Sequence, residues 1–187
     1  PNTPQRCYNS LKKPISECNM SQAESKNKIL IIDDEQSTIL LLSAIFKDSY
    51  QVETAQSSHD AILKIHEFQP DLITSDIYMP GLDGDALLPI IHAWKPHIPV
   101  LVISGSIDPD IKQKCTDKGA SGFIAKPFER IPLQEQVQKI LAGEVPANKV
   151  SENIISEVEL AISILEREGL ITREQSKEEL NKIKSRL

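Results

Sequence analysis

The sequence predicts an α/β fold, namely a five-stranded, doubly wound parallel sheet that is followed by a C-terminal helical hairpin. Short apolar runs alternate with segments whose apolar residues recur at helical spacing. This alternation is typical of βαβ units and of a parallel sheet. Five such units lie within residues 28–143, and polar side chains directly follow most of the apolar runs. Because ligands of open parallel sheets bind beyond the carboxyl ends of the strands, we expect the functional site there.

The individual elements follow from the apolar pattern in chain order. Residues 28–32 are apolar and β-branched at consecutive positions, as in a strand that is buried on both faces of a sheet. The apolar residues between 39 and 46 recur at helical spacing and predict the first helix. The same reasoning predicts strands at 50–54, 72–75, 100–103 and 122–125, and helices at 58–68, 86–94, 110–118 and 133–142.

The composition excludes several classes of protein. Of the 187 residues, 40% are hydrophobic and 26% are charged, with 7 Gly and 12 Pro. These values exclude collagen-like and wholly disordered chains. The longest aliphatic runs have four residues, whereas roughly 20 are needed to span a bilayer, so we predict no membrane association. Residues 1–27 have no apolar segment of the secretory type and are expected to form a disordered or weakly ordered extension of a cytoplasmic protein.

The charge balance argues against nucleic acid as a partner. The chain carries 21 Lys and Arg against 27 Asp and Glu, a net charge of −6. Residues 144–187, where an output domain would lie, carry 7 basic against 9 acidic side chains. Tight DNA binding needs a basic surface that displaces phosphate counterions. We therefore predict no nucleic-acid binding.

Polar side chains collect where the predicted strands end. Asp33 and Asp34 follow the first strand, Asp76 the third, Ser104 the fourth and Lys126 the fifth. Carboxylates that converge on one edge repel one another unless a cation offsets them, and Mg²⁺ prefers oxygen ligands of this kind. A carboxylate beside Mg²⁺, a lysine and a hydroxyl is also suited to aspartyl-phosphate chemistry. This edge is therefore predicted to accept a phosphoryl group.

Each of these residues also has a structural interpretation. Asp33 or Asp34 alone caps a helix about as often as it serves a site, and Asp76 or Ser104 alone is typical of a turn. The functional prediction depends on the combination, because the polar groups occur in the order that one mechanism requires. The glycine-rich phosphate loops of nucleotide-binding proteins are missing from the sequence. Tyr78 stands where a haloacid-dehalogenase-like phosphatase would need a second acid.

Four motifs carry a family resemblance. They read IIDDE at 31–35, DIYMPGLDG at 76–84, ISG at 103–105 and GASGFIAKPF at 119–128. Together they resemble the response-regulator receiver domain, the phosphoacceptor module of bacterial two-component signalling. The resemblance covers residues 28–143 and implies a flavodoxin-like, CheY-like fold.

The resemblance also implies the roles of individual residues. It makes Asp76 the phosphoacceptor, Ser104 the switch hydroxyl and Lys126 the cation that contacts the phosphoryl group, so that these three residues form the catalytic set. Phe123 occupies the position of the switch aromatic residue. Two positions depart from the commonest pattern, because Ser104 replaces the more usual threonine and Phe123 stands where tyrosine is frequent. Both retain the group that the switch needs, a hydroxyl and an aromatic ring.

The resemblance further implies a metal site and partners. Asp33 and Asp34 would hold Mg²⁺ together with Asp76 and the backbone carbonyl of Tyr78. The phosphodonor would be a sensor histidine kinase or a phosphotransfer protein. Such a protein has self-phosphorylation and autodephosphorylation activity rather than the turnover of an ordinary enzyme.

Residues 144–187 are predicted to form a linker, at 144–149, and a helical hairpin. The apolar positions 154, 158, 161 and 165 form a seam on the first helix, Thr172 is the expected N-cap of the second, and 180, 183 and 187 form a thinner stripe. Residues 165–187 resemble the short C-terminal (SHOCT) domain. A hairpin of this size is too small to be stable alone. We favour self-association or partner binding through it, with intrachain packing as the alternative.

The function predicted from the sequence is that of a signalling switch. A kinase phosphorylates Asp76, and the receiver then changes how its surface or tail engages a downstream protein target. Ser104 and Phe123 are expected to transmit the change through the fourth helix and the fifth strand to the tail. The alternative is a phosphorelay or phosphate-sink receiver whose main output is autodephosphorylation.

Overall fold

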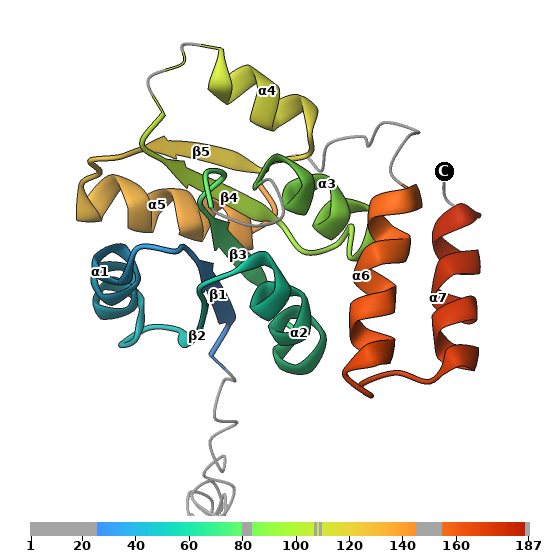
Figure 1. Ribbon diagram of the computed structural model, residues 1–187. Helices are drawn as coiled ribbons and strands as arrows, with labels where there is room; N and C mark the ends of the chain where they lie inside the picture. Colours follow the sequence, from blue (N-terminus) through green and yellow to red (C-terminus); the bar gives the residue numbers. More distant parts are fainter. Residues whose placement is uncertain (1–25, 80–83, 107, 109, 145–154, 186–187) are drawn as a thin grey trace, which may run out of the picture.

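The structure is a computed structural model that describes residues 26–79, 84–106, 108, 110–144 and 155–185 (Figure 1). Strands and helices alternate along the chain, and two further helices follow. The strands are β1 (Lys28–Ile32), β2 (Gln51–Ala55), β3 (Leu72–Ser75), β4 (Val100–Ser104) and β5 (Gly122–Ala125). The helices are α1 (Gln36–Phe46), α2 (Ser58–Phe68), α3 (Gly84–Trp94), α4 (Ile111–Asp117), α5 (Arg130–Leu141), α6 (Ile155–Arg167) and α7 (Arg173–Lys184). The predictions made for residues 1–25, for the linker at 145–149 and for positions 154 and 187 lie outside the described residues.

The sheet is parallel, with the strand order β2-β1-β3-β4-β5. This confirms the predicted five-stranded, doubly wound fold. Ile32 pairs with Ser75 between β1 and β3, and Ser104 pairs with Ala125 between β4 and β5. β1 and β3 therefore end level with each other, as do β4 and β5, although β4 runs two residues beyond β3 because Ser75 pairs with Val102. The residues that follow these parallel strands still lie at one edge of the sheet.

Two hydrophobic clusters lie on the opposite faces of the sheet. One contains the inner residues of α1 and α5, and the other contains those of α2, α3, α4 and α6. The strands supply alternate residues to the two clusters, with Leu30 and Ile32 in the second and Ile29 and Ile31 in the first. A strand that is apolar at every position is therefore buried on both sides, as its sequence indicated.

Several helix and strand ends differ by one to three residues from the predicted ones. The largest difference is at α5, which begins at Arg130 instead of residue 133. Pro132 lies in the first turn of α5, where a proline fits because its missing N–H has no partner within the helix. The strand β2 lies one residue later than predicted, at Gln51–Ala55.

The C-terminal segment forms a hairpin of α6 and α7, hereafter the hairpin, and α6 lies against α2 and α3 (Figure 1). Val158, Ala161 and Leu165 of the predicted seam are at most 1% exposed. Thr172 caps α7 as predicted, because its Oγ1 accepts a hydrogen bond from the Gln175 N–H at 3.3 Å. The described part of the chain thus buries the seam within the same molecule. No helix in that part has the length and apolarity that crossing a bilayer requires.

Candidate functional site

The polar residues predicted for the site follow the strands directly, and the backbone pairing of the sheet extends to them. The N–H of Asp76 donates to the carbonyl of Ile32 at 2.9 Å, and the N–H of Lys126 donates to the carbonyl of Ser104 at 2.8 Å. Each residue is thereby fixed against the end of the neighbouring strand. The sheet itself positions the backbone of the site.

A lysine joins the two buried carboxylates at this edge. Lys126 Nζ donates to Asp33 Oδ2 at 2.7 Å and to Asp76 Oδ2 at 2.8 Å. Asp33 is 1% exposed and Asp76 is 8% exposed. We call Asp33, Asp34, Asp76 and Lys126 the acid edge. Residues from the ends of β1, β3 and β5 thus meet in one cluster, as the sequence predicted.

The second oxygen of each buried carboxylate is held by the backbone. Asp33 Oδ1 accepts a hydrogen bond from the Glu35 N–H at 2.9 Å, and Asp76 Oδ1 accepts one from the Tyr78 N–H at 3.0 Å. Both oxygens of Asp33 and both of Asp76 therefore have a donor. Hydrogen bonds to ionised carboxylates are among the stronger ones in proteins, so the two side chains are held in one orientation.

Burial and charge act in opposite directions on the acid edge. Burial raises the pKa of Asp33 above its ordinary value, although the hydrogen bonds from Lys126 and Glu35 act to lower it. Burial by itself lowers the pKa of the Lys126 ammonium, but the hydrogen bonds and charges of Asp33 and Asp76 outweigh it and raise that pKa. Burial thus disfavours the charged form of Asp33, while the lysine stays protonated.

The donor set of the acid edge suits a hard divalent cation. One ammonium faces two buried carboxylates, and Asp34 adds a third, exposed carboxylate next to Asp33 in the chain. This excess of oxygen donors with negative charge fits Mg²⁺. Among the described residues, no three His, Cys, Asp or Glu side chains are gathered into a ready-made metal cluster. The structure brings Asp33, Asp76 and Lys126 together, and it leaves Asp34 exposed.

The two predicted switch residues lie on one face of the sheet. Ser104 is fully buried, and Phe123 is half-buried against the cluster that contains α2, α3, α4 and α6. Phe123 pairs with Val102, and Ser104 follows Val102 by two positions on β4, so the side chains alternate onto the same face. Both residues therefore adjoin the larger cluster.

Ser106 was not predicted from the sequence, although it joins two loops at the site. Its N–H lies 3.4 Å from Ser104 Oγ, and its own Oγ lies 3.4 Å from the hydroxyl of Tyr78. The loop after β3 is thus linked to the loop after β4. The only sequence signal was a second serine, two residues beyond the predicted Ser104.

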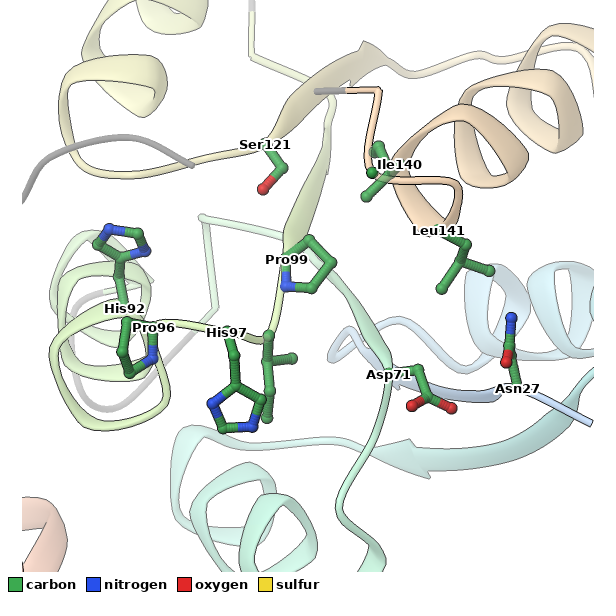
Figure 2. Close-up of a pocket in the computed structure, with 11 residues that line it drawn as sticks. Asn27, Asp71, His92, Pro96, His97, Pro99, Ser121, Ile140 and Leu141 are labelled. Atoms are coloured by element: carbon green, nitrogen blue, oxygen red, sulfur yellow. The ribbon is translucent and has the colours of Figure 1, made fainter. Parts of the chain in front are cut away.

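A cavity of about 380 Å³ lies at the opposite end of the sheet (Figure 2). Its lining includes Asn27, Asp71 and Ser121, which precede β1, β3 and β5. The carboxylate of Asp71 already accepts a hydrogen bond from the Lys28 N–H at 2.7 Å. His92 also lines the cavity, and its ring lies close against Gly119. This cavity is therefore separate from the acid edge, and close packing accounts for its buried histidine.

Comparison with protein families matches residues 29–138 to the response regulator receiver domain. The transcriptional regulatory protein ZraR of Salmonella typhimurium is 34% identical over 118 residues, which are 63% of this chain and 27% of ZraR. Sporulation initiation phosphotransferase F of Bacillus subtilis is 31% identical over 115 residues, which are 61% of this chain and 93% of that protein. The chain thus spans about a quarter of the first relative and nearly all of the second.

Comparison with solved structures also finds CheY-like proteins. The chemotaxis protein CheY4 of Vibrio cholerae superposes with a TM-score of 0.58 and 29% identity, over 62% of this chain and 98% of that chain. A CheX–CheY complex with BeF₃ and Mg²⁺ from Borrelia burgdorferi gives a TM-score of 0.58 and 30% identity, over 61% of this chain and 88% of that chain. The five-stranded unit therefore has a CheY-like fold.

Proposed function

This chain belongs to the response regulator receiver domain family, and from that premise we propose that Asp76 accepts a phosphoryl group from a sensor histidine kinase or a phosphotransfer protein. The observation that carries the proposal is the pair of hydrogen bonds from Lys126 to Asp33 and Asp76. They place a partly buried cation beside a buried carboxylate at the carboxyl edge of the sheet, where charge on transferring oxygens can be neutralised.

Mg²⁺ completes the proposed site. Asp33, Asp34 and Asp76 would hold the ion together with the backbone carbonyl of Tyr78. The excess of carboxylate over ammonium at the acid edge supports this assignment. When bound, the ion supplies positive charge to the phosphoryl oxygens. Asp34 is exposed, so we expect Asp34→Ala to weaken Mg²⁺ binding without unfolding the domain.

The remaining steps of phosphoryl transfer are carried out by residues of the chain itself. One carboxylate oxygen of Asp76 attacks phosphorus, and an O–P bond forms as the bond from phosphorus to the donor breaks. The leaving group keeps the bonding electron pair and takes its proton from solvent. Lys126 then pairs with a phosphoryl oxygen, and the Ser104 hydroxyl donates to another. If Asp76 Oδ2 is the attacking oxygen, its single hydrogen bond from Lys126 is lost in the step, because the phosphoryl group then occupies that oxygen.

The output proposed is a change in protein–protein contact. Phe123 packs against the cluster of α2, α3, α4 and α6 and shares a sheet face with Ser104, so movement of the serine toward the phosphoryl oxygens would open space for the ring. The downstream target, or a second copy that self-associates through the hairpin, would sense the change. The weak likeness of residues 165–187 to the short C-terminal domain agrees with an interaction role. We expect this activity in the cytoplasm.

We propose that the described residues do not bind DNA. The basic side chains of α7 are accompanied by glutamates, and Lys182 pairs with Glu178 at 2.8 Å while Lys184 pairs with Glu159 at 3.1 Å. A recognition helix needs unpaired basic groups on one face. A salt-sensitive, sequence-selective gel shift by the purified chain would contradict this proposal.

The alternative function is that of a phosphate sink, in which self-phosphorylation and autodephosphorylation are the main output and no partner senses the change. The two functions share the chemistry at Asp76 and differ in whether phosphorylation alters binding. Retention of the hydroxyl and the aromatic ring at 104 and 123 favours the switch.

The proposed chemistry is tested by intact-mass spectrometry of the full chain with acetyl phosphate. With Mg²⁺ the chain should gain one phosphate, and with EDTA it should gain none. Asp76→Asn should stay unmodified, while Asp71→Asn, a matched change at the other end of the sheet, should behave like the wild type. Equal phosphorylation of the Asp76→Asn chain would refute the assignment.

A further inference from the structure

The contact between α6 and the receiver is packed like a protein core. Val158 and Ala161 of α6 are 0% exposed and Leu165 is 1% exposed. They belong to the same hydrophobic cluster as the inner residues of α2 and α3. We call the side of α2 and α3 that α6 covers the α2–α3 face (Figure 1). This face binds an amphipathic helix with small or branched apolar side chains at spacings of three and four residues.

Trp94, the one tryptophan of the chain, lies at this contact. It is 3% exposed and stacks on His66 of α2, with the ring centroids 6.4 Å apart and the planes 3° from parallel. Trp94, His66, Leu165 of α6 and Ile171 line one cavity of about 260 Å³. The environment of the indole therefore depends on whether the hairpin is docked.

Polar contacts contribute little to this docking. His59 at the start of α2 lies 3.2 Å from an Arg167 guanidinium nitrogen and 3.6 Å from a Glu168 carboxylate oxygen. All three side chains are 40% exposed or more, and exposed pairs of this kind are weak. Apolar burial thus dominates, and it depends on how closely the two surfaces match.

The acid edge reaches the same cluster through the residues after Asp76. Ile77 is 4% exposed and Met79 is 5% exposed, and both pack in the cluster that contains α3 and α6. Between them, the N–H of Tyr78 donates to Asp76 Oδ1. A change in the hydrogen bonds of the Asp76 carboxylate therefore acts on a segment whose two flanking side chains lie in the cluster that also contains α3 and α6.

We propose that the α2–α3 face is a switchable helix-binding surface, that α6 of the same chain is its occupant, and that phosphorylation of Asp76 releases α6. The inference rests on the proposed function, because it needs the acyl phosphate at Asp76. In this proposal the structural change reaches the hairpin through α2 and α3, on which α6 packs. This route differs from transmission through α4, β5 and α5.

The direction follows from the packing. With both Asp76 oxygens bonded to Lys126 and to the Tyr78 N–H, the surfaces of α6 and the α2–α3 face match with almost no exposed apolar area at 158, 161 and 165. Phosphorylation replaces part of this hydrogen bonding and shifts the segment at Ile77 and Met79. A close-packed contact loses attraction whichever way one surface moves, so the docked state is weakened.

The test follows Trp94 emission and hydrogen exchange in the full chain, with intact mass recorded on the same samples. With Mg²⁺ and acetyl phosphate, the emission maximum should move to longer wavelength in proportion to the phosphorylated fraction. Amides of 155–185 should exchange about tenfold faster, within the usual range of coupling between two sites. Asp76→Asn should show neither change when the donor is added.

Two variants on one turn of α6 supply the matched control. Ala161→Glu places a carboxylate in the buried contact, so this variant should show the shifted emission before any donor is added and change little afterwards. Leu160→Glu makes the same substitution at a side chain that is 44% exposed, and it should respond like the wild type. Both variants should still gain the phosphate, because neither residue lies at the acid edge.

The outcomes separate the inference from the proposed function. A chain that gains the phosphate while emission and exchange stay constant would overturn the release of α6 and leave the chemistry at Asp76 intact. Slower exchange in 155–185 would overturn it as well, because the hairpin would then bind more tightly. Failure to gain the phosphate would overturn the proposed function, and with it this inference. The hydrogen-exchange measurement on the wild type tests the release of α6 even if Ala161→Glu does not fold.

Discussion

The acid edge and the hairpin contact are held together by different forces. At the acid edge, each oxygen of Asp33 and Asp76 accepts a directed hydrogen bond, and Lys126 connects the two side chains. At the hairpin contact, burial is apolar, and the polar pairs lie at the exposed rim. Directed bonds specify one geometry, whereas apolar contact specifies only that two surfaces match. The first region is therefore suited to chemistry, and the second to exchange between docked and released states.

The largest expected effect concerns the hairpin contact. Leu165→Ala should reduce the stability of docking by about 3 kcal/mol, because it removes a fully buried side chain and leaves a cavity. Hydrogen exchange of the α6 amides measures this loss. Leu160→Ala, on the exposed side of α6, should leave exchange unchanged. If docking and phosphorylation are coupled, reciprocity requires Leu165→Ala to accept the phosphoryl group at least as readily as the wild type.

The next effect is at the acid edge. Lys126→Met should lower the free energy of unfolding in EDTA by about 2 kcal/mol, because it leaves two buried carboxylates without their cation. Mg²⁺ should recover part of the loss, since it binds the folded state. Lys114, which pairs with Asp108 at 2.6 Å on the surface, gives the control, and Lys114→Met should have no resolvable effect in urea denaturation. Equal losses in the two variants would mean that the Lys126 pair is an ordinary surface pair.

A smaller effect depends on pH. Burial raises the pKa of Asp33 in the folded state, so its ionisation opposes folding. The stability that comes from the neutral form is present below the ordinary carboxyl pKa and is lost as the pH rises through the raised value. Asp33→Asn should therefore stabilise the Mg²⁺-free protein at pH 7, by an amount that shrinks at acid pH. A stabilisation that grows as the pH falls would contradict the direction of the pKa change.

The smallest effect is in the core on the α1 and α5 side of the sheet, the face opposite to the hairpin. Thr74 on β3 is 1% exposed, and its hydroxyl has no hydrogen-bond partner among the residues that the structure describes. Thr74→Val should raise the free energy of unfolding by about 1 kcal/mol, because it removes a buried unsatisfied hydroxyl with little change in shape. Thr38→Val is the control, because Thr38 Oγ1 donates to Glu35 Oε2 at 2.8 Å. That variant should be less stable than the wild type in the same denaturation experiment.

The acid edge was largely predictable from the sequence. The strand order and the shared direction of the strands in a parallel sheet bring Asp33, Asp76 and Lys126 to one edge once the strands are assigned. The sequence did not reveal that Asp34 is exposed, because the side chains of two adjacent residues after a strand point in different directions. Ser106 was missed since it lies outside the strand-end pattern and acts through a loop contact.

The hairpin contact was predictable in part. Spacing predicted that Val158, Ala161 and Leu165 would be buried, and Thr172 was recognised as a cap. The surface that covers the seam was not predictable, because an apolar stripe indicates burial without naming its partner. The α2–α3 face is assembled from two segments that are distant from α6 in the chain, and only the fold brings them together.

The most direct test of the central claim is to identify the modified residue. The chain is treated with acetyl phosphate and Mg²⁺ and then reduced with borohydride, which converts an aspartyl phosphate to homoserine. Peptide mass spectrometry then identifies the position of the homoserine in the chain. The account predicts homoserine at position 76 alone, with none when EDTA replaces Mg²⁺. Homoserine at position 33 or 34, or an unreduced aspartate at 76 in a chain that has gained one phosphate, would contradict it.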